Sequence, residues 1–419
     1  MGSRDIKETG DPPAFGHPML AQFGFEPTYV NLNHGSYGSL PLPVLRACEE
    51  ISRKAEANPD RFYRSTYVPL LNTVRAKVAE LIGADTDDCV VVFNATHGVN
   101  TVLRNLIWQK EDIIVKTSVT YPSVARTIQY ITDVPPHPKY VPFQLNFPTT
   151  PSAIIDGFRA HLKSIPRQPD RKIVAVIDSI SSTPGVLLPW KELVKICREE
   201  GVLSVVDAAH SIGQELDINL RETDPDFWIS NCHKWLYAKR ACAVLYVAKR
   251  NQDLIRTTLP TTSNYVSPTD PPGGPKPPNY PDQFMWAGTI DWAPYLSVSH
   301  ALEFRQWVGG EHKINDYCHN LALSGGRRLA EILGTRVMDE NGEFTANMVN
   351  VQLPLNADGS DKVMSNIMRR LDGKNVNGKP YYHNGKWWVR CSAQIFNEVG
   401  DFEVLGEALL EICRGNLDG

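Results

Sequence analysis

The chain has 419 residues, of which 42% are hydrophobic and 21% charged, so it is long enough to bury a large core and to form two or three domains. Its formal net charge of −4 at pH 7 provides no general attraction to nucleic acid or to an anionic membrane. No apolar run approaches the roughly 20 residues of a membrane-spanning helix, and the N-terminal stretch MGSRDIKETGDPPAFG is polar, so we expect no secretory signal.

The eight cysteines are scattered along the chain. They form no C-x-x-C pair and no spacing typical of a disulfide framework or of a zinc site. We therefore expect a cytosolic protein with free thiols and no bound metal.

Short apolar runs alternate with helical patterns through the first part of the chain. The candidate strands, in chain order, are CVVVFNA (89–95), EDIIVK (111–116), KIVAVID (172–178), VLSVVD (202–207), DFWIS (226–230) and ACAVLYVA (241–248). TVLRNLIW follows the first strand as a candidate helix, and PWKELVKICREEG (189–201) has helical spacing and a glycine stop. This alternation predicts an α/β fold with a mostly parallel sheet covered by helices.

The later part of the chain has a different character. SPTDPPGGPKPPNYP (267–281) contains seven prolines and predicts a long loop. Two helical stretches then precede a strand in MVNVQLP, a helix around 362–371, a strand in KWWVRCSAQI and a last helix from residue 401, which together predict a smaller α+β unit. We divide the chain into an N-terminal segment (1–30), a large domain (31–300) and a small C-terminal domain (301–419).

Polar residues stand where the candidate strands of the large domain end. Asp207 ends VLSVVD, Lys234 follows DFWIS, Ser182 lies four residues past KIVAVID, and Thr96 and His97 follow CVVVFNA. Because ligands bind outside the carboxyl ends of the strands in open α/β sheets, we expect these side chains to share one site.

The chemistry of this set points to one cofactor. A buried lysine amine condenses with an aldehyde, a carboxylate pairs with a protonated pyridine nitrogen, and free amides at a helix start bind phosphate. These three groups describe pyridoxal 5′-phosphate (PLP). Taken singly, the aspartate is more often a helix cap or ion-pair partner, the lysine a solvated residue and NATHGVN an ordinary turn, so it is their ordered combination that favours the cofactor.

Four motifs carry a resemblance to a known family. VVDAAHSIG, DFWISNCHKWLYAKRACAVLYV, FMWAGTID and WWVRCSAQIFN resemble the class V, fold-type I PLP enzymes, and the match runs from about residue 20 to the C-terminus. The resemblance implies a large domain with a mostly parallel seven-stranded sheet and a smaller α+β C-terminal domain. Within the isopenicillin-N-epimerase-like subgroup, YVNLNHGSYGSLP, NATHGVNTVLRNL and TYPSVARTI are most similar to the fungal C–S lyases of ergothioneine biosynthesis and to the PLP enzyme of the loline pathway.

The resemblance implies a role for each cofactor-binding residue. Lys234 is the Schiff-base lysine and Asp207 the pyridinium partner. His210 lies near the ring and its O3′, and Ser182 stands where relatives have a side chain that bonds O3′. Thr96, His97 and His233 bind the phosphate, whereas Gly288 and Thr289 reach the phosphate of the other subunit, which implies a homodimer with shared active sites.

It implies further roles on the substrate side. Arg390 binds the carboxylate of an amino-acid substrate, a task suited to guanidinium. Tyr121 either stacks on the cofactor or acts as a general acid toward a departing sulfur, and a core aromatic is the alternative. Asn33 and His34 line the substrate side, unless His34 caps the start of the fold.

Two departures from the family pattern affect this site. The residues 238–241 are Ala, Lys, Arg and Ala where relatives often have proline and glycine, so the orientation of Lys239 and Arg240 stays open. Phe396 stands where relatives commonly have tyrosine.

The predicted site residues restrict the reaction to four types that begin with removal of the Cα proton. With the substrate joined to PLP as an imine, Lys234 is placed to remove the Cα proton, and β-elimination, epimerisation, transamination or carbon–carbon bond formation can follow. Only Cys242 and Cys318 lie between Lys234 and Arg390, each in a strand or helix pattern, which disfavours a desulfurase with its own persulfide carrier.

We therefore expect β-elimination with C–S cleavage of a cysteine-derived substrate or its sulfoxide. The alternatives are a loline-type enzyme that forms a cyclic amino acid, an epimerase or aminotransferase, and a non-catalytic PLP-fold binding module. The presence of both Lys234 and Asp207 argues against the last.

Overall fold

The computed structural model describes residues 10–262, 264–267, 269–271 and 278–415. Most of the polar N-terminal stretch and residues 268 and 272–277 of the proline-rich stretch lie outside these ranges. The other residues of that stretch contain no helix or strand, as predicted for a loop. Within the described ranges, no helix combines the length and the apolar character needed to cross a membrane.

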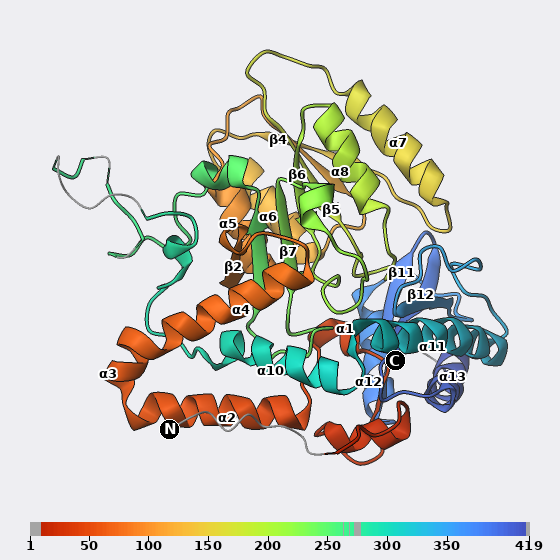
Figure 1. Ribbon diagram of the computed structural model, residues 1–419. Coiled ribbons are helices and arrows are strands. Elements are labelled where there is room, and N and C mark those ends of the chain that lie inside the picture. The colour runs from red at the N-terminus through yellow and green to blue at the C-terminus, as the bar shows by residue number, and fades with distance from the viewer. Residues whose placement is uncertain (1–9, 263, 268, 272–277, 416–419) are drawn as a thin grey trace.

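A seven-stranded sheet forms the centre of the large domain, in the order β2-β8-β7-β6-β5-β3-β4 (Figure 1). The strands are β2 (Cys89–Val92), β3 (Ile113–Thr117), β4 (Lys139–Phe143), β5 (Ile173–Asp178), β6 (Leu203–Asp207), β7 (Phe227–Asn231) and β8 (Ala243–Val247). Only the β8 pairings, with β2 and β7, are antiparallel. The predicted α/β fold with a mostly parallel sheet is confirmed. Strand β4 was not predicted, because it is a largely exposed edge strand that contains a proline.

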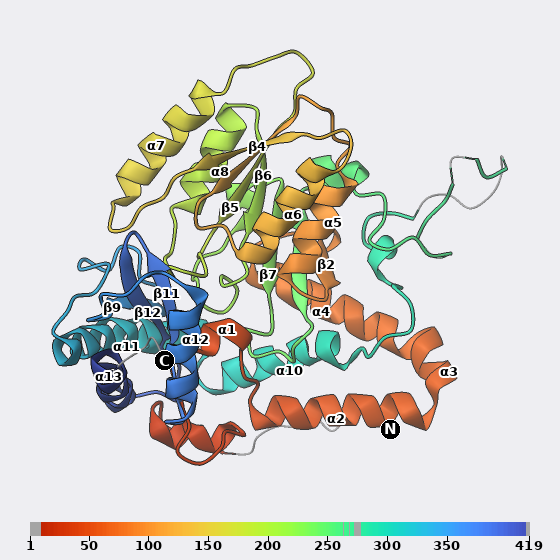
Figure 2. The ribbon, with the colours of Figure 1, turned by 180° about the vertical axis from the view of Figure 1, so that it is seen from behind.

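The sheet is buried on both faces, which explains its continuous apolar runs. Val174 and Val176 of β5 pack with α5 (Ala95–Asn105) and α6 (Pro122–Asp133). Their neighbours Ile173, Ala175 and Ile177 belong to the opposite core, with α7 (Pro151–Ser164) and α8 (Trp190–Glu199). Figures 1 and 2 show these helix pairs on the two sides of the sheet. This alternation follows from the two-residue period of a strand.

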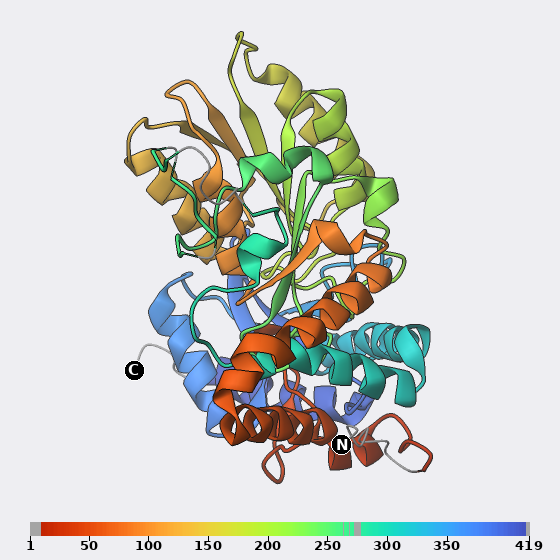
Figure 3. The same ribbon diagram turned by 60° about the vertical axis from the view of Figure 1, so that its left-hand side comes forward.

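Long helices close the base of the large domain. Helix α10 (Ala293–Trp307) packs against α2 (Leu42–Ala57) and α4 (Tyr67–Leu81), as Figure 3 shows. The remaining short helices are α1 (His34–Tyr37), α3 (Pro59–Arg61) and α9 (Leu220–Thr223). Because α10 spans residue 300, the boundary placed there stays a prediction.

The C-terminal part holds a three-stranded antiparallel sheet in the order β11-β12-β9. Its strands are β9 (Met348–Gln352), β11 (Lys379–His383) and β12 (Lys386–Ser392), and its helices are α11 (Gly310–Leu333), α12 (Asp361–Asp372) and α13 (Val399–Arg414). The N-terminal segment joins this unit through β1 (Val30–Asn31), which pairs with β10 (Val376–Asn377). The residues that follow β1 contact both units, since Ser392 N of β12 donates to Leu32 O at 2.7 Å and His34 Nε2 lies 2.8 Å from the carbonyl oxygen of Lys234, just past β7.

Candidate active site

Lys234 is the centre of the site. It follows β7 by three residues and lines a cavity of about 760 Å³. Burial, and then the positive charge of Arg390, lower its pKa to about 7, while the carboxylate of Asp207 acts in the opposite direction. No carboxylate of the described residues lies within ion-pair distance of its Nζ. A large fraction of Lys234 is therefore a neutral, nucleophilic amine near pH 7.

His210 fixes the environment of that amine. The indole N–H of Trp235 donates to His210 Nδ1 at 3.2 Å, and indole has no acceptor, so Nδ1 carries no proton. The ring proton is thus on Nε2, which lies 3.1 Å from Lys234 Nζ. Burial lowers the pKa of His210 well below its usual value, so the ring is neutral. His210 can then donate Nε2–H to the lone pair of neutral Lys234.

Asp207 and Asp178 are neighbours at the ends of β6 and β5, and both are buried. Ala209 N donates to Asp207 Oδ1 at 3.2 Å, and Oδ2 has no donor among the described residues. Burial raises the pKa of Asp207, whereas this hydrogen bond and Lys234 lower it. The pKa of Asp178 is raised further, by burial and then by Asp207. Two adjacent buried carboxyl groups favour a single negative charge on the pair, and the positive charge of Lys234, which lowers the pKa of Asp207, favours its place on Asp207.

Arg390 of β12 is a buried cation without a carboxylate partner in the described part of the chain. Its Nη1 donates to Ser182 O at 2.8 Å, and its Nη2 donates to Asn33 Oδ1 at 3.0 Å and Ser36 Oγ at 2.9 Å. These bonds use three of the five N–H groups of a guanidinium, and Nε has no partner. Burial lowers the pKa of Arg390 to about 10, so it stays charged and can receive an anion.

The cavity brings together the predicted residues of the substrate side. Asn33, His34, Tyr121, Ser182 and Arg390 line it with Lys234. His34 Nε2 donates to the Lys234 carbonyl at 2.8 Å, so this ring also anchors the lysine backbone. Tyr121 directly precedes α6 and is 40% exposed, which excludes a core aromatic.

The three residues that depart from the family pattern differ in their position relative to the cavity. Arg240 lines the cavity and donates to Gly38 O at 2.9 Å, whereas Lys239 points away, with its Nζ 3.6 Å from Asp291. Phe396 is buried and packs on Phe23 and Phe25.

Thr96 and His97 lie in the first turn of α5. Asn231 Oδ1 accepts from Ala95 N at 2.8 Å and Asn94 Oδ1 from His97 N at 2.8 Å, while the Thr96 amide has no acceptor among the described residues. A free amide at a helix start suits a phosphate. The His97 ring packs on Phe93 with a centroid distance of 5.0 Å, and its Nε2 lies 3.4 Å from Thr258 Oγ1.

The other residues predicted to bind phosphate, His233, Gly288 and Thr289, lie outside helix α5. His233 donates Nδ1–H to Cys242 O at 2.9 Å, and burial lowers its pKa to about 4, so the neutral ring presents an acceptor at Nε2. Gly288 and Thr289 lie in the loop before α10, outside the cavity of Lys234, and a Cβ at Gly288 would meet open space. Their roles stay predictions.

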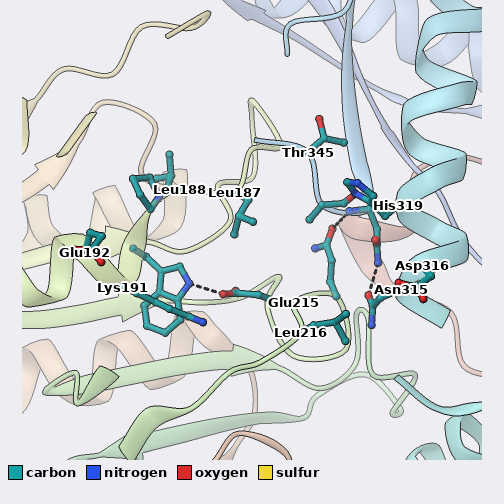
Figure 4. A pocket seen from close by; sticks show the side chains of 15 residues that line it. Leu187, Leu188, Lys191, Glu192, Glu215, Leu216, Asn315, Asp316, His319 and Thr345 are labelled. Carbon is teal, nitrogen blue, oxygen red and sulfur yellow. Dashed lines mark hydrogen bonds between the residues drawn. The ribbon is translucent and has the colours of Figure 1, made fainter. Parts of the chain in front are cut away.

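A second cavity of about 550 Å³ lies between the loop leading into α8 and helix α11 (Figure 4). Gln214 in its wall donates to His210 O at 2.8 Å and accepts from Asn347 N at 3.0 Å. This side chain ties the turn that carries His210 to the small domain.

Sequence reasoning missed four residues that shape the site. Ser36 holds Arg390, Trp235 orients His210, Asp178 takes the proton beside Asp207, and Lys379 lines the outer cavity. Asp178 offered a signal, since it ends its strand as Asp207 does. The contacts of the other three depend on chain segments far apart in sequence.

These side chains fit PLP. They supply a neutral lysine for the aldehyde, a carboxylate oxygen free for the ring nitrogen, and a free amide at a helix start for the phosphate. In the described part of the chain, no group of three or more His, Cys, Asp or Glu side chains is arranged to hold a metal ion.

Comparisons with known proteins agree with this chemistry. The model of the family Aminotransferase class-V matches residues 36–369. L-cysteine desulfhydrase-like protein lolT1 of Epichloe uncinata is 34% identical, over 96% of this chain and 96% of that protein. Hercynylcysteine sulfoxide lyase of Schizosaccharomyces pombe is 30% identical, over 95% and 98%. The fold matches the cystine C-S lyase C-DES, solved with its reaction product cysteine persulfide, at a TM-score of 0.77 and 18% identity over 94% of this chain and 99% of that one.

Proposed function

This chain belongs to the class-V aminotransferase family, and from that premise we propose that it is a PLP-dependent lyase that cleaves a C–S bond of a cysteine-derived amino acid by β-elimination. The observation that carries the proposal is geometric: Lys234 Nζ lies 3.1 Å from His210 Nε2, and Lys234 lines one cavity with Arg390, a buried cation without a carboxylate partner among the described residues. The products are pyruvate, ammonia and the sulfur-containing leaving group.

The residues of the chain divide the work. PLP, when bound, withdraws electrons from the substrate carbon that carries the amino group. Arg390 holds the substrate carboxylate with the N–H groups that Ser182, Asn33 and Ser36 leave free, which orients the Cα–H bond. Lys234 takes the Cα proton, and Asp207 keeps the ring nitrogen protonated.

Tyr121 is the proposed proton donor to the leaving sulfur. It lines the cavity with Lys234 and Arg390, and its partial exposure leaves its hydroxyl free to turn toward a substrate. Stacking on the cofactor is the alternative role for the same ring.

A persulfide carrier is not part of the proposed mechanism. Cys242 and Cys318, the cysteines between Lys234 and Arg390, are both 0% exposed. Neither can reach a substrate sulfur without local unfolding, so direct release of the sulfur group is favoured.

We further propose a cytosolic homodimer with shared active sites. The loop with Gly288 and Thr289 lies outside the cavity of its own chain and is available to a second copy. All eight cysteines are free, and seven of them are buried, which suits a reducing compartment.

The test is a substrate screen with a matched pair of variants. S-substituted cysteines and their sulfoxides are incubated with the holoenzyme, and pyruvate and ammonia are measured. Lys234→Ala is expected to abolish pyruvate formation, whereas Lys239→Ala, which removes a lysine paired with Asp291 outside the cavity, keeps it. Borohydride reduction followed by peptide mapping is expected to place the pyridoxyl group on Lys234.

Absence of pyruvate with every substrate would contradict the lyase proposal. A cyclised amino acid formed without pyruvate would instead indicate the bond-forming alternative. Exchange of deuterium into Cα of otherwise unchanged substrate would indicate an epimerase.

A further inference from the structure

The cavity of Lys234 continues outward, past Arg390, into a region that the proposed mechanism does not use. Its outer wall is formed by Tyr29 of the N-terminal segment and by Met368, Asp372, Asn377 and Lys379 of the small domain. Its volume of about 760 Å³ lies in the upper part of the range of ~300–1,000 Å³ typical of sites for drug-sized ligands. The cavity therefore has room for a substrate larger than cysteine.

Lys379 and Arg390 stand side by side on this wall. They are directly opposite each other in the antiparallel pair of β11 and β12, so their side chains share one face of the sheet. Like charges in this position are destabilising. Burial, and then the charge of Arg390, lower the pKa of Lys379, which expresses the same repulsion. The two neighbouring cations at this cavity therefore repel each other, and their pairing does not stabilise the fold.

Lys379 also lacks a counter-ion. Its Nζ lies 3.8 Å from the thioether of Met368, a weak acceptor, and no carboxylate of the described residues is within ion-pair distance. Other partly exposed lysines differ in this respect. Lys77 lies 3.1 Å from Glu303, and Lys374 lies 2.7 Å from Glu411. Lys379 is therefore a half-buried cation that lines the cavity, and among the described residues its ammonium group donates only to the weak thioether acceptor of Met368.

We propose that Lys379 is a specificity residue that binds a second anionic group of the substrate, a carboxylate carried by the substituent on sulfur. This inference rests on the proposed C–S lyase function and names the class of its substrate. Arg390 is fully buried and receives the carboxylate next to the reacting carbon. Lys379 extends toward α12 at the outer wall and receives the distal one.

Asp372 lines the same outer cavity and is the residue that would favour a positive substituent instead. Its side chain is exposed at the end of α12, where water and salt screen its charge. Lys379 is half-buried, so water and salt screen its charge less than that of Asp372. An anionic substituent is therefore the preferred ligand.

The test compares three substrates of similar length that differ in terminal charge: S-(2-carboxyethyl)cysteine, S-propylcysteine and S-(2-aminoethyl)cysteine. For each we measure kcat/KM for pyruvate and, from the absorbance change of the bound cofactor, the Kd. The wild-type holoenzyme is expected to prefer the carboxyethyl substrate over the propyl one by about tenfold or more, the effect of a hydrogen bond to a charged group.

Three variants assign the preference. Lys379→Met is expected to remove the preference for the carboxyethyl substrate without changing kcat/KM or Kd for the propyl substrate. Lys379→Arg is expected to keep most of the preference. Lys386→Met, at the exposed start of β12 and outside the cavity, is the matched control and retains the wild-type ratio.

Three outcomes overturn the subsite, two of them seen in the variants and one in the wild-type enzyme. An equal loss on all three substrates in Lys379→Met would mean that this residue assists Arg390 at the first carboxylate. A wild-type preference for the aminoethyl substrate that Asp372→Asn removes would assign the outer cavity to a cation. Because Kd is read from the cofactor band, a carboxyethyl preference in binding without pyruvate supports the subsite and contradicts only the lyase function. Pyruvate formed with equal Kd values contradicts only the subsite.

Discussion

The indole N–H of Trp235 donates to Nδ1 of His210 at 3.2 Å, and the opposite nitrogen of that ring lies 3.1 Å from Lys234 Nζ. The residue next to the lysine in sequence thus acts on it through a histidine 24 residues earlier. Because the indole can only donate, it holds His210 in the tautomer that donates to a neutral amine. Trp235 is a positioning residue for the lysine.

Trp235→Phe is expected to raise the pKa of Lys234, because neutral Lys234 loses the donor that stabilises its lone pair. The measurement is the rate of acylation of Lys234 in the apoenzyme against pH, followed by peptide mapping. Trp228→Phe is the control, since the indole N–H of buried Trp228 has no partner among the described residues. The same midpoint in both variants would show that Trp235 acts only in packing.

Arg390→Gln is expected to move the same midpoint above about 7. The guanidinium is the charge that lowers the pKa of Lys234 after burial, so its removal makes the protonated amine less unfavourable. Below the midpoint Lys234 is protonated and unreactive, so the variant needs a higher pH for the same labelling rate. A midpoint that stays at about 7 would mean that burial alone sets it.

Asp178→Asn and Asp207→Asn are expected to differ sharply. Asp178 carries the proton, so a neutral amide of the same shape keeps the bond donated by Thr117 at 3.3 Å, and kcat/KM changes by a few-fold at most. Asp207→Asn removes the charge that faces the ring nitrogen, and kcat/KM falls by about 100-fold or more. The absorption band of the cofactor is recorded alongside. A larger loss in Asp178→Asn than in Asp207→Asn would place the negative charge on Asp178 instead.

Gly185→Ala is expected to raise KM by about 10- to 100-fold while cofactor binding is unchanged. A Cβ at this position would lie 2.6 Å from Arg390 Cδ, and that side chain is buried and held by three hydrogen bonds, so the guanidinium must shift. Gly400→Ala in α13 is the control, because nothing lies within 4 Å of its added Cβ. An unchanged KM would show that Arg390 does not bind the substrate carboxylate.

The sequence by itself determined the α/β class, six of the seven strands of the large sheet, and the strand ends that carry Asp207 and Lys234. These features are local: continuous apolar runs form buried parallel strands, and a polar residue at the end of such a run lies at the edge of the sheet. Edge strand β4 escaped prediction because its residues are exposed and one is a proline, so it lacks the apolar pattern of the central strands.

Only the tertiary structure decided the pKa values of the site residues and the hydrogen bonds between them. Arg390 meets Asn33 across 357 residues and lowers the pKa of a lysine 156 residues before it, and Lys379 shares its wall only because β11 and β12 pair in one register. Desolvation and the Coulomb energy depend on distance in space and on burial, and neither can be read from spacing along the chain.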